Sequence, residues 1–83
     1  FGRREAVPGL LRLCDDANAG VVEAAREALV LIGRHGGAVS VARALNGMPP
    51  DLRRRRVDEI AARDRQLGDR VDRMMRHDEL MAA

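Results

Sequence analysis

The sequence predicts an all-α fold, and three observations support this expectation. Apolar residues make up 46% of the 83 residues, mainly as Ala, Leu, Val, Ile and Met, and there is a single aromatic residue. Small and aliphatic side chains of this kind favour closely packed helices. Apolar positions recur at helical spacing, whereas few stretches alternate as a half-buried strand would. Asp, Asn, Pro and Gly also stand where helices are expected to begin and end.

The first predicted helix covers about Arg3 to Cys14. Its apolar residues follow the i, i+3, i+4, i+7 spacing of one helical face; they are Val7, Leu10, Leu11 and Cys14. Pro8 lies inside this pattern, where it either kinks the helix or marks its true start.

The second predicted helix runs from about Ala19 to Arg34. It follows a turn at residues 15–20, in which Asp16 and Asn18 supply side-chain oxygens that accept backbone N–H groups at a helix start. Its expected apolar face consists of Val21, Ala24, Ala25, Ala28, Leu29 and Ile32. The glycines Gly33, Gly36 and Gly37 are expected to end the helix, with Arg34 and His35 near the negative end of its dipole.

A third, short helix is expected from about Ala38 to Leu45. Its predicted buried residues are Val39, Ala42 and Leu45, with Val41 as a further candidate. The clearest break in the chain follows at residues 46–51. Pro50 suits the first position of the next helix, and Asp51 suits the positive end of that helix.

A charged stretch then runs to about Leu80. Its apolar residues fall near heptad spacing, at Val57, Ile60, Leu67, Val71, Met74 and Met81. Asp64 and Asp78 interrupt this seam. Opposite charges recur four residues apart, as Asp51–Arg55, Arg54–Asp58, Glu59–Arg63, Asp69–Arg73 and Asp72–Arg76. Such pairs favour a helix without specifying how it packs.

Residues 6–33, AVPGLLRLCDDANAGVVEAAREALVLIG, resemble a HEAT or armadillo repeat. The matching positions are Pro8, Leu10, Leu11, Leu13, Asp16, Asn18, Val21, Ala25, Ala28, Leu29 and Ile32. Val22 stands where HEAT units often carry Arg, so the armadillo pattern is closer. The resemblance implies an antiparallel helix pair that stacks on neighbouring units, and about three such units are needed for stability. We therefore divide the chain into residues 1–47, the repeat-like unit with the short helix, and residues 48–83, a charged helical extension or cap.

The length of the charged stretch raises a packing problem. As one helix, residues 51–80 would span about 45 Å, against about 24 Å for the second helix. The long helix either breaks near Gly68 and folds back, stacks on preceding repeats, or pairs with a second chain. We favour a break near Gly68 or pairing, because Gly weakens a helix interior.

No catalytic, cofactor-binding or metal site is predicted. Ser40 is the only Ser, and Cys14 lies on an apolar helix face, where Cys packs as a small hydrophobe. His35 and His77 have no second His or Cys at ligand spacing. The carboxylates that a catalytic site would need, Asp58, Glu59 and Asp64, each have Arg within three or four residues and indicate an exposed, ion-paired face.

The candidate partner-binding residues are Arg53, Arg54, Arg55 and Arg56, together with Met74 and Met75. Four consecutive helical Arg side chains fan through about 300°, so a solvated helix start with ion pairs is the favoured interpretation and recognition of a partner the alternative. The methionines are either an adaptable binding surface or, as we favour, helix-interface packing.

The resemblance implies a non-catalytic scaffold or adaptor that binds a protein or peptide. One alternative is a nucleic-acid-binding HEAT-like repeat, which is less favoured because Arg and acidic residues are mixed and the net charge is only +2. Another is a regulatory or oligomerisation segment of a larger enzyme, and the C-terminal helix is a candidate for self-association. No apolar run of about 18 residues is present, so no membrane span is expected. The lone Cys fits a reducing compartment, and we expect an intracellular, cytoplasmic location.

Overall fold

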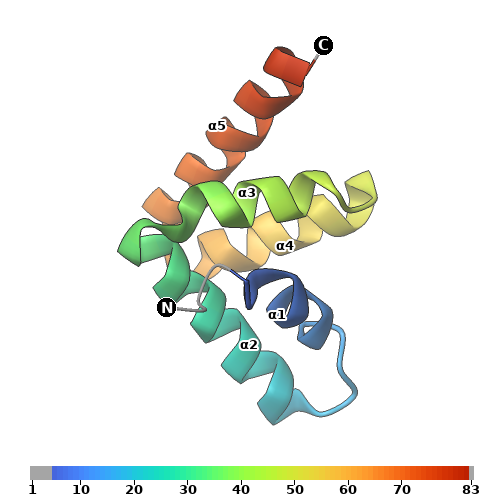
Figure 1. Cartoon of the computed structure of the whole chain (residues 1–83). Helices are drawn as coiled ribbons and strands as arrows, with labels where there is room; N and C mark the ends of the chain where they lie inside the picture. Colours follow the sequence, from blue (N-terminus) through green and yellow to red (C-terminus); the bar gives the residue numbers. More distant parts are fainter. Residues whose placement is uncertain (1–4, 83) are drawn as a thin grey trace.

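The computed structural model describes the backbone of residues 5–82 and the side chains of residues 5–77. This part of the chain contains helices and no strand, so the predicted all-α class is confirmed. The elements are α1 (Val7–Leu13), α2 (Ala19–Ile32), η1 (Gly33–Gly37), α3 (Ala38–Asn46), α4 (Pro50–Arg63) and α5 (Arg65–Ala82). Helices α1 and α2 pack against each other, α3 and α4 lie together, and α5 crosses both of them (Figure 1). None of the helices within residues 5–82 combines the length and the apolar composition that crossing a membrane requires.

The first two helices begin where their polar and proline residues place them. Pro8 lies in the first turn of α1, so it marks the start of this helix rather than a kink. The predicted start at Arg3 lies outside the described residues. At α2, Asn18 Oδ1 accepts hydrogen bonds from the amides of Gly20 at 2.8 Å and Val21 at 3.3 Å, and Asp16 Oδ1 accepts one from the amide of Asn18 at 2.8 Å. The predicted capping turn is confirmed.

The connection η1 turns the chain from α2 into α3. Helical geometry is interrupted at His35 (φ −103°, ψ 38°) and at Gly36, whose φ is 90°. A side chain at Gly36 would strain the backbone, because residues with a Cβ rarely adopt this left-handed region. The glycine-rich stretch therefore ends α2 as predicted and also sets the direction of α3.

The charged stretch breaks at Asp64, four residues before the position predicted at Gly68. Asp64 is extended (φ −151°, ψ 97°), and its Oδ1 accepts a hydrogen bond from the amide of Leu67 at 3.0 Å, which caps α5. Gly68 lies inside α5 at the contact with α4. A Cβ on Gly68 would stand 2.6 Å from the Cβ of Ala61. The chain folds back, as one of the three predicted arrangements required. The break, however, is at Asp64, and Gly68 instead allows close contact between α4 and α5.

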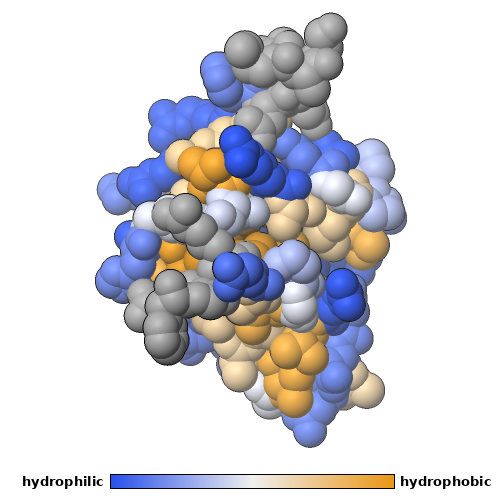
Figure 2. Space-filling model, in the orientation of Figure 1, coloured by the Kyte–Doolittle hydropathy of each residue, from blue (hydrophilic) through white to orange (hydrophobic). Residues whose placement is uncertain are grey.

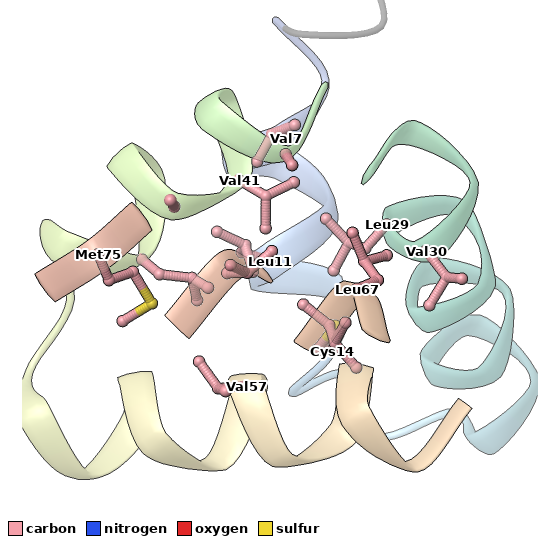
Figure 3. Close-up of a cluster of buried hydrophobic side chains, with 14 of the residues drawn as sticks. Val7, Leu11, Cys14, Leu29, Val30, Val41, Val57, Leu67 and Met75 are labelled. Carbon is pink, nitrogen blue, oxygen red and sulfur yellow. The ribbon is translucent and has the colours of Figure 1, made fainter. Parts of the chain in front are cut away.

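One hydrophobic core joins the two halves of the sequence. Its residues come from all five helices and from the end of α1, and Figure 3 labels Val7, Leu11, Cys14, Leu29, Val30, Val41, Val57, Leu67 and Met75. Residues from both 1–47 and 48–83 therefore share one interior. The packed helices measure 38 × 27 × 23 Å along the principal axes.

The buried faces differ from prediction at five positions. Val39 was expected in the core but is 45% exposed, because the buried residues of α3 follow helical spacing from Ala38 and Val39 lies beside that face. In α2, Ala24 is exposed and Val30 is buried, since α2 also contacts α4. In α5 the core position after Val71 is Met75, whereas Met74 is half-buried. The side chains of Asp78 and Met81 in the predicted seam lie outside the described residues.

Candidate binding groove

An open groove lies between α3 and α5. It has a volume of about 350 Å³ and is lined by Val39, Ala42, Arg70, Arg73, Met74 and His77. Val39 and Ala42 of α3 and Met74 of α5 make its apolar floor, and the three basic side chains of α5 make its rim. Figure 2 shows apolar surface where α5 passes α3, with hydrophilic side chains around it.

Helix α3 brings Val39 to the groove because its other apolar residues are used in the core. The core-facing residues are Ala38, Val41, Ala42 and Leu45, all with less than 5% of their surface exposed. They occupy one face of α3, and a residue 100° away from that face points to the side. Val39 therefore lies at the edge of the core, where α5 passes.

Helix α5 carries one core-facing stripe and one stripe toward the groove. The core-facing stripe is Leu67, Val71 and Met75, spaced four residues apart. The groove stripe is Arg70, Arg73, Met74 and His77, which follows the i, i+3, i+4, i+7 spacing of one helical face. The two stripes come from the same helix, so the packing of the first fixes the position of the second.

Two contacts hold α5 at this position. Gly68 allows α4 and α5 to approach closely, because a Cβ at Gly68 would stand only 2.7 Å from the Cα of Ala61. At the other end of the crossing, Asn46 Nδ2, at the end of α3, donates a hydrogen bond of 3.2 Å to the carbonyl oxygen of Met75. Helix α5 is thus held against both α4 and α3.

The rim of the groove is basic. No carboxylate among the described side chains lines it, and within this part of the chain Arg70 and Arg73 form no ion pair. The charge of Arg70 does contribute to lowering the pKa of Asp64 at the start of α5, although the hydrogen bond from Arg34 is the largest cause and that from the Leu67 amide is next. Arg34 Nε lies 2.7 Å from Asp64 Oδ2.

A second hollow, between α4 and α5, differs in its charge. It has a volume of about 180 Å³ and is lined by Pro50, Arg53, Arg54, Val57, Asp72, Met75 and Arg76. Its acid, Asp72, pairs with Arg76 at 3.1 Å and with Arg54 at 3.7 Å. The cations there are compensated from within the fold, unlike those of the α3/α5 groove.

The four predicted partner-binding arginines are not equivalent in the structure. Arg55 and Arg54 are exposed, and Arg54 pairs with Asp58 at 3.1 Å. Arg53 is half-buried and donates a hydrogen bond of 3.2 Å to the carbonyl oxygen of Met48. Arg56 is only 1% exposed. The interpretation of all four as a solvated helix start is therefore wrong for Arg56.

Arg56 is the centre of a polar cluster that we call the junction network, formed by Asp15, Arg26, Arg56 and Glu59. Its Nη1 lies 2.5 Å from both carboxylate oxygens of Glu59, and its Nη2 donates to Asp15 Oδ1. Arg26 Nη2 lies 3.0 Å from Glu59 Oε2. The network joins α4 to α2 and to the turn that follows α1.

The charge of Arg56 is stabilised despite its burial. Burial acts against the guanidinium charge, but the hydrogen bonds with Glu59 and Asp15 outweigh it and raise the pKa of Arg56. Arg56 therefore stays charged and paired. Burial likewise raises the pKa of the neighbouring Cys14 thiol, which is 4% exposed, so the thiolate that would react is disfavoured. The prediction that Cys14 packs in the core is confirmed.

The two predicted methionines also differ in burial. Met74 lies in the groove, and Met75 is 5% exposed in the core. Burial leaves Met75 and Arg56 no surface for a partner, so the predicted set reduces to Arg53, Arg54, Arg55 and Met74. Only Met74 of these lines the α3/α5 groove.

The predicted ion pairs along the charged stretch form in part. Arg54–Asp58 and Asp72–Arg76 are present at 3.1 Å each. Glu59 and Arg63 take other partners: Glu59 pairs with Arg56 and Arg26, and Arg63 with Glu23 of α2. Where α4 faces α2, the pairs Arg26–Glu59 and Glu23–Arg63 thus join the two helices, while Arg56–Glu59 stays within α4.

Sequence reasoning did not identify most of the groove. Val39 was assigned to the core, and Arg70, Arg73 and His77 were not among the predicted partner-binding residues; the assignment of Ala42 to the core is confirmed. One signal was present: Arg70, Arg73 and His77 share a helical face with Met74, so a methionine lies in a basic stripe. The α3 side of the groove could not be predicted from the sequence, because it depends on where α5 crosses α3.

The described side chains contain no group of three or more His, Cys, Asp or Glu that could hold a metal ion. No family model matches the chain, and no curated protein or solved structure shows significant similarity to it. Functional inference therefore depends on the geometry of the groove and the junction network.

Proposed function

We propose that this chain is a non-catalytic protein-binding module of the helical-repeat type and that the α3/α5 groove is its binding surface. The observation that carries the proposal is the groove itself: an apolar floor at the surface, bordered by basic side chains, with no described carboxylate in its lining. Val39 is 45% exposed there, although the same helix buries its other Val almost completely. An apolar surface with a charged border is typical of a protein-interaction site.

Two features support the repeat-type part of the proposal. Helices α1 and α2 pack as a pair through the turn that Asp16 and Asn18 form. This pair also leaves apolar surface uncovered, with Leu13 41% and Leu31 47% exposed. Such surface is expected of a repeat that stacks on a neighbouring unit. Further units on either side of this sequence would agree with an armadillo-like or HEAT-like array.

The two alternatives predict other partners. A nucleic acid would use the basic rim, but the apolar floor offers nothing to phosphates, and no Phe, Tyr or Trp lines the groove for base stacking. A regulatory or oligomerisation segment of an enzyme would use the groove against its own parent protein or a second copy. We favour a separate protein partner and treat these cases as outcomes of the test below.

The test is photo-crosslinking within the full-length protein, in the cells that normally produce it. Replacing Val39 by the photoreactive residue p-benzoylphenylalanine places the probe in the groove, and the same replacement of the exposed Arg55 on α4 is the matched control. We expect a protein adduct from position 39 that position 55 does not give. Adducts to nucleic acid, or equal adducts from both positions, would contradict the proposal. An adduct to the parent protein or a second copy would favour the enzyme-segment alternative.

A further inference from the structure

We propose that the groove binds an acidic amphipathic helix of another protein. Apolar side chains of that helix would contact Val39 and Met74, while its carboxylates would pair with Arg70, Arg73 and His77. The inference depends on the proposed function, because it names the partner chemistry of the same site. The charge and the spacing of the groove residues favour this one kind of partner.

The spacing of the basic rim fits a helical partner. Arg70, Arg73 and His77 lie at i, i+3 and i+7 on α5, so they extend over about 10 Å of helix. A second helix that carries Asp or Glu at the same spacing presents its carboxylates along one face with the same period. The i+4 position lies on the same face as those carboxylates and can be apolar. This is the helix-in-groove mode, in which an amphipathic helix lays its apolar face into a hydrophobic groove.

The charge of the rim requires an acidic partner. Two arginines of the neighbouring α4/α5 hollow have acids within the fold: Arg54 pairs with Asp58 and Asp72, and Arg76 pairs with Asp72. Arg70 and Arg73 form no ion pair within the described part of the chain. A partner with carboxylates at the rim gains charge-assisted hydrogen bonds there, and Arg favours carboxylates because its planar donors match them.

The volume of the groove limits the apolar contact. About 350 Å³ lies at the low end of the range of ligand sites, which is about 300–1,000 Å³. The groove therefore takes a few side chains rather than a whole helix, and the partner helix lies across its mouth. Affinity then depends on both the apolar anchor and the carboxylates, so removing either one should be measurable.

The experiment is a fluorescence-anisotropy titration with a labelled synthetic peptide. The probe is an N-acetylated peptide of about 15 residues, long enough for an isolated helix to begin to form, with Leu on one face and Glu at i, i+3 and i+7 beside it. The matched control peptide has Gln in place of each Glu. The protein is tested as wild type, as the double variant Arg70→Glu/Arg73→Glu, and as Arg55→Glu, which makes the same kind of charge change on the exposed face of α4.

We expect the Glu peptide to bind wild type and to bind about tenfold or more weakly when either the peptide carboxylates or the two arginines are replaced. Arg55→Glu should change affinity by about twofold at most, since Arg55 does not line the groove. Binding should weaken as salt is added. A peptide with Lys in place of Glu should recover binding to the double variant, because the charges are then exchanged.

Several outcomes would overturn the inference. These are equal binding of the Glu and Gln peptides, undiminished binding to the double variant, no binding of the Glu peptide at millimolar concentration, or tighter binding of a labelled DNA oligonucleotide. Far-UV circular dichroism shows whether each variant keeps its helix content, and the Lys peptide tests the double variant even if its stability is reduced. A protein adduct from position 39 together with equal binding of the two peptides refutes the acidic partner and leaves the binding-module function standing. No adduct from position 39 refutes both.

Discussion

Arginines of the same charged stretch differ in burial and in ion pairing between the junction network and the groove. Arg56 in the junction network is 1% exposed and is held between Asp15 and Glu59. No carboxylate among the described side chains lines the groove with Arg70 and Arg73, although Arg73 also borders a hollow with Asp69 and Asp72. Arg56 differs because its counter-ions, Glu59 on the same helix and Asp15 in the turn after α1, are held within the fold. We therefore expect Arg56 to stabilise the fold, and Arg70 and Arg73 to contribute to the proposed binding.

The largest effect is expected from breaking the junction network. Arg56→Met removes the guanidinium and leaves Glu59, whose side chain is only 17% exposed, without its closest partner. Removing one partner of a buried ion pair costs about 3–5 kcal/mol, and we expect the lower end because half of Asp15 can be solvated. The free energy of unfolding is measured by urea denaturation, followed by far-UV circular dichroism.

Arg55→Met is the matched control for this variant. It makes the same change one residue away on α4, at an exposed position, and should alter the free energy of unfolding by no more than about 0.5 kcal/mol. Equal losses from the two variants would show that Arg56 has no special structural role, and the contrast between the two regions would then be lost.

The next effect concerns the helix contact that positions the groove. Gly68→Ala would bring a Cβ to 2.6 Å from the Cβ of Ala61, so α4 and α5 must separate. We expect a loss of about 1–3 kcal/mol in the free energy of unfolding and weaker binding of the Glu peptide. Gly9→Ala in α1 is the control, because no atom lies within 4 Å of the added Cβ there, and it should be neutral or slightly stabilising. A neutral Gly68→Ala would contradict the close contact.

A smaller, pH-dependent effect is expected at Asp64. The hydrogen bond from Arg34, and then that from the Leu67 amide, lower the pKa of Asp64 below its ordinary value of 3.8. Its stabilising contribution is therefore fully present above that value and is lost as the pH falls through the lower pKa of the folded state. Asp64→Asn can keep the cap but loses the ion pair, so the difference in unfolding free energy from wild type should disappear in strong acid. A difference that stays constant with pH would refute this.

The smallest effect on stability is expected at the groove floor. Val39→Ser changes a side chain that is already 45% exposed, so the free energy of unfolding should shift by about 0.5 kcal/mol or less. Val41→Ser, two residues along the same helix, changes a side chain that is 1% exposed and should cost about 2 kcal/mol or more. Val39→Ser should nevertheless weaken binding of the Glu peptide, because Val39 lies in the groove. Equal costs for the two valines would mean that Val39 belongs to the core.

Local signals allowed much of the fold to be predicted from the sequence. Asp16 and Asn18 predicted the capping turn because their side-chain oxygens act on amides only two or three residues away. Pro50 and the glycines of η1 act on the backbone at their own positions. Asp64 carried a local signal as well, since an acid that interrupts an apolar seam also suits a helix start. Gly68 was instead interpreted as a weak point of a helix, although it serves a contact with another helix.

Properties that depend on distant residues could not be predicted in this way. Four consecutive arginines look alike in the sequence, and only Arg56 faces Asp15, 41 residues earlier. Val39 and Val41 are likewise the same residue type on one short helix, and the position of α5 decides which one lines the groove. The site depends on how the helices cross, which helical periodicity alone does not specify.

The most direct test of the contrast between the two regions is an NMR titration of the protein with the Glu peptide, observed at its backbone amides. We expect chemical-shift changes at residues 39–42 of α3 and 70–77 of α5, while the amides of Asp15, Arg26, Arg56 and Glu59 stay unchanged. Chemical-shift changes centred on those four residues, or on α1 and α2, would contradict the account. In that case Arg70 and Arg73 would not mark the binding surface, and the role of Arg56 would not be structural alone.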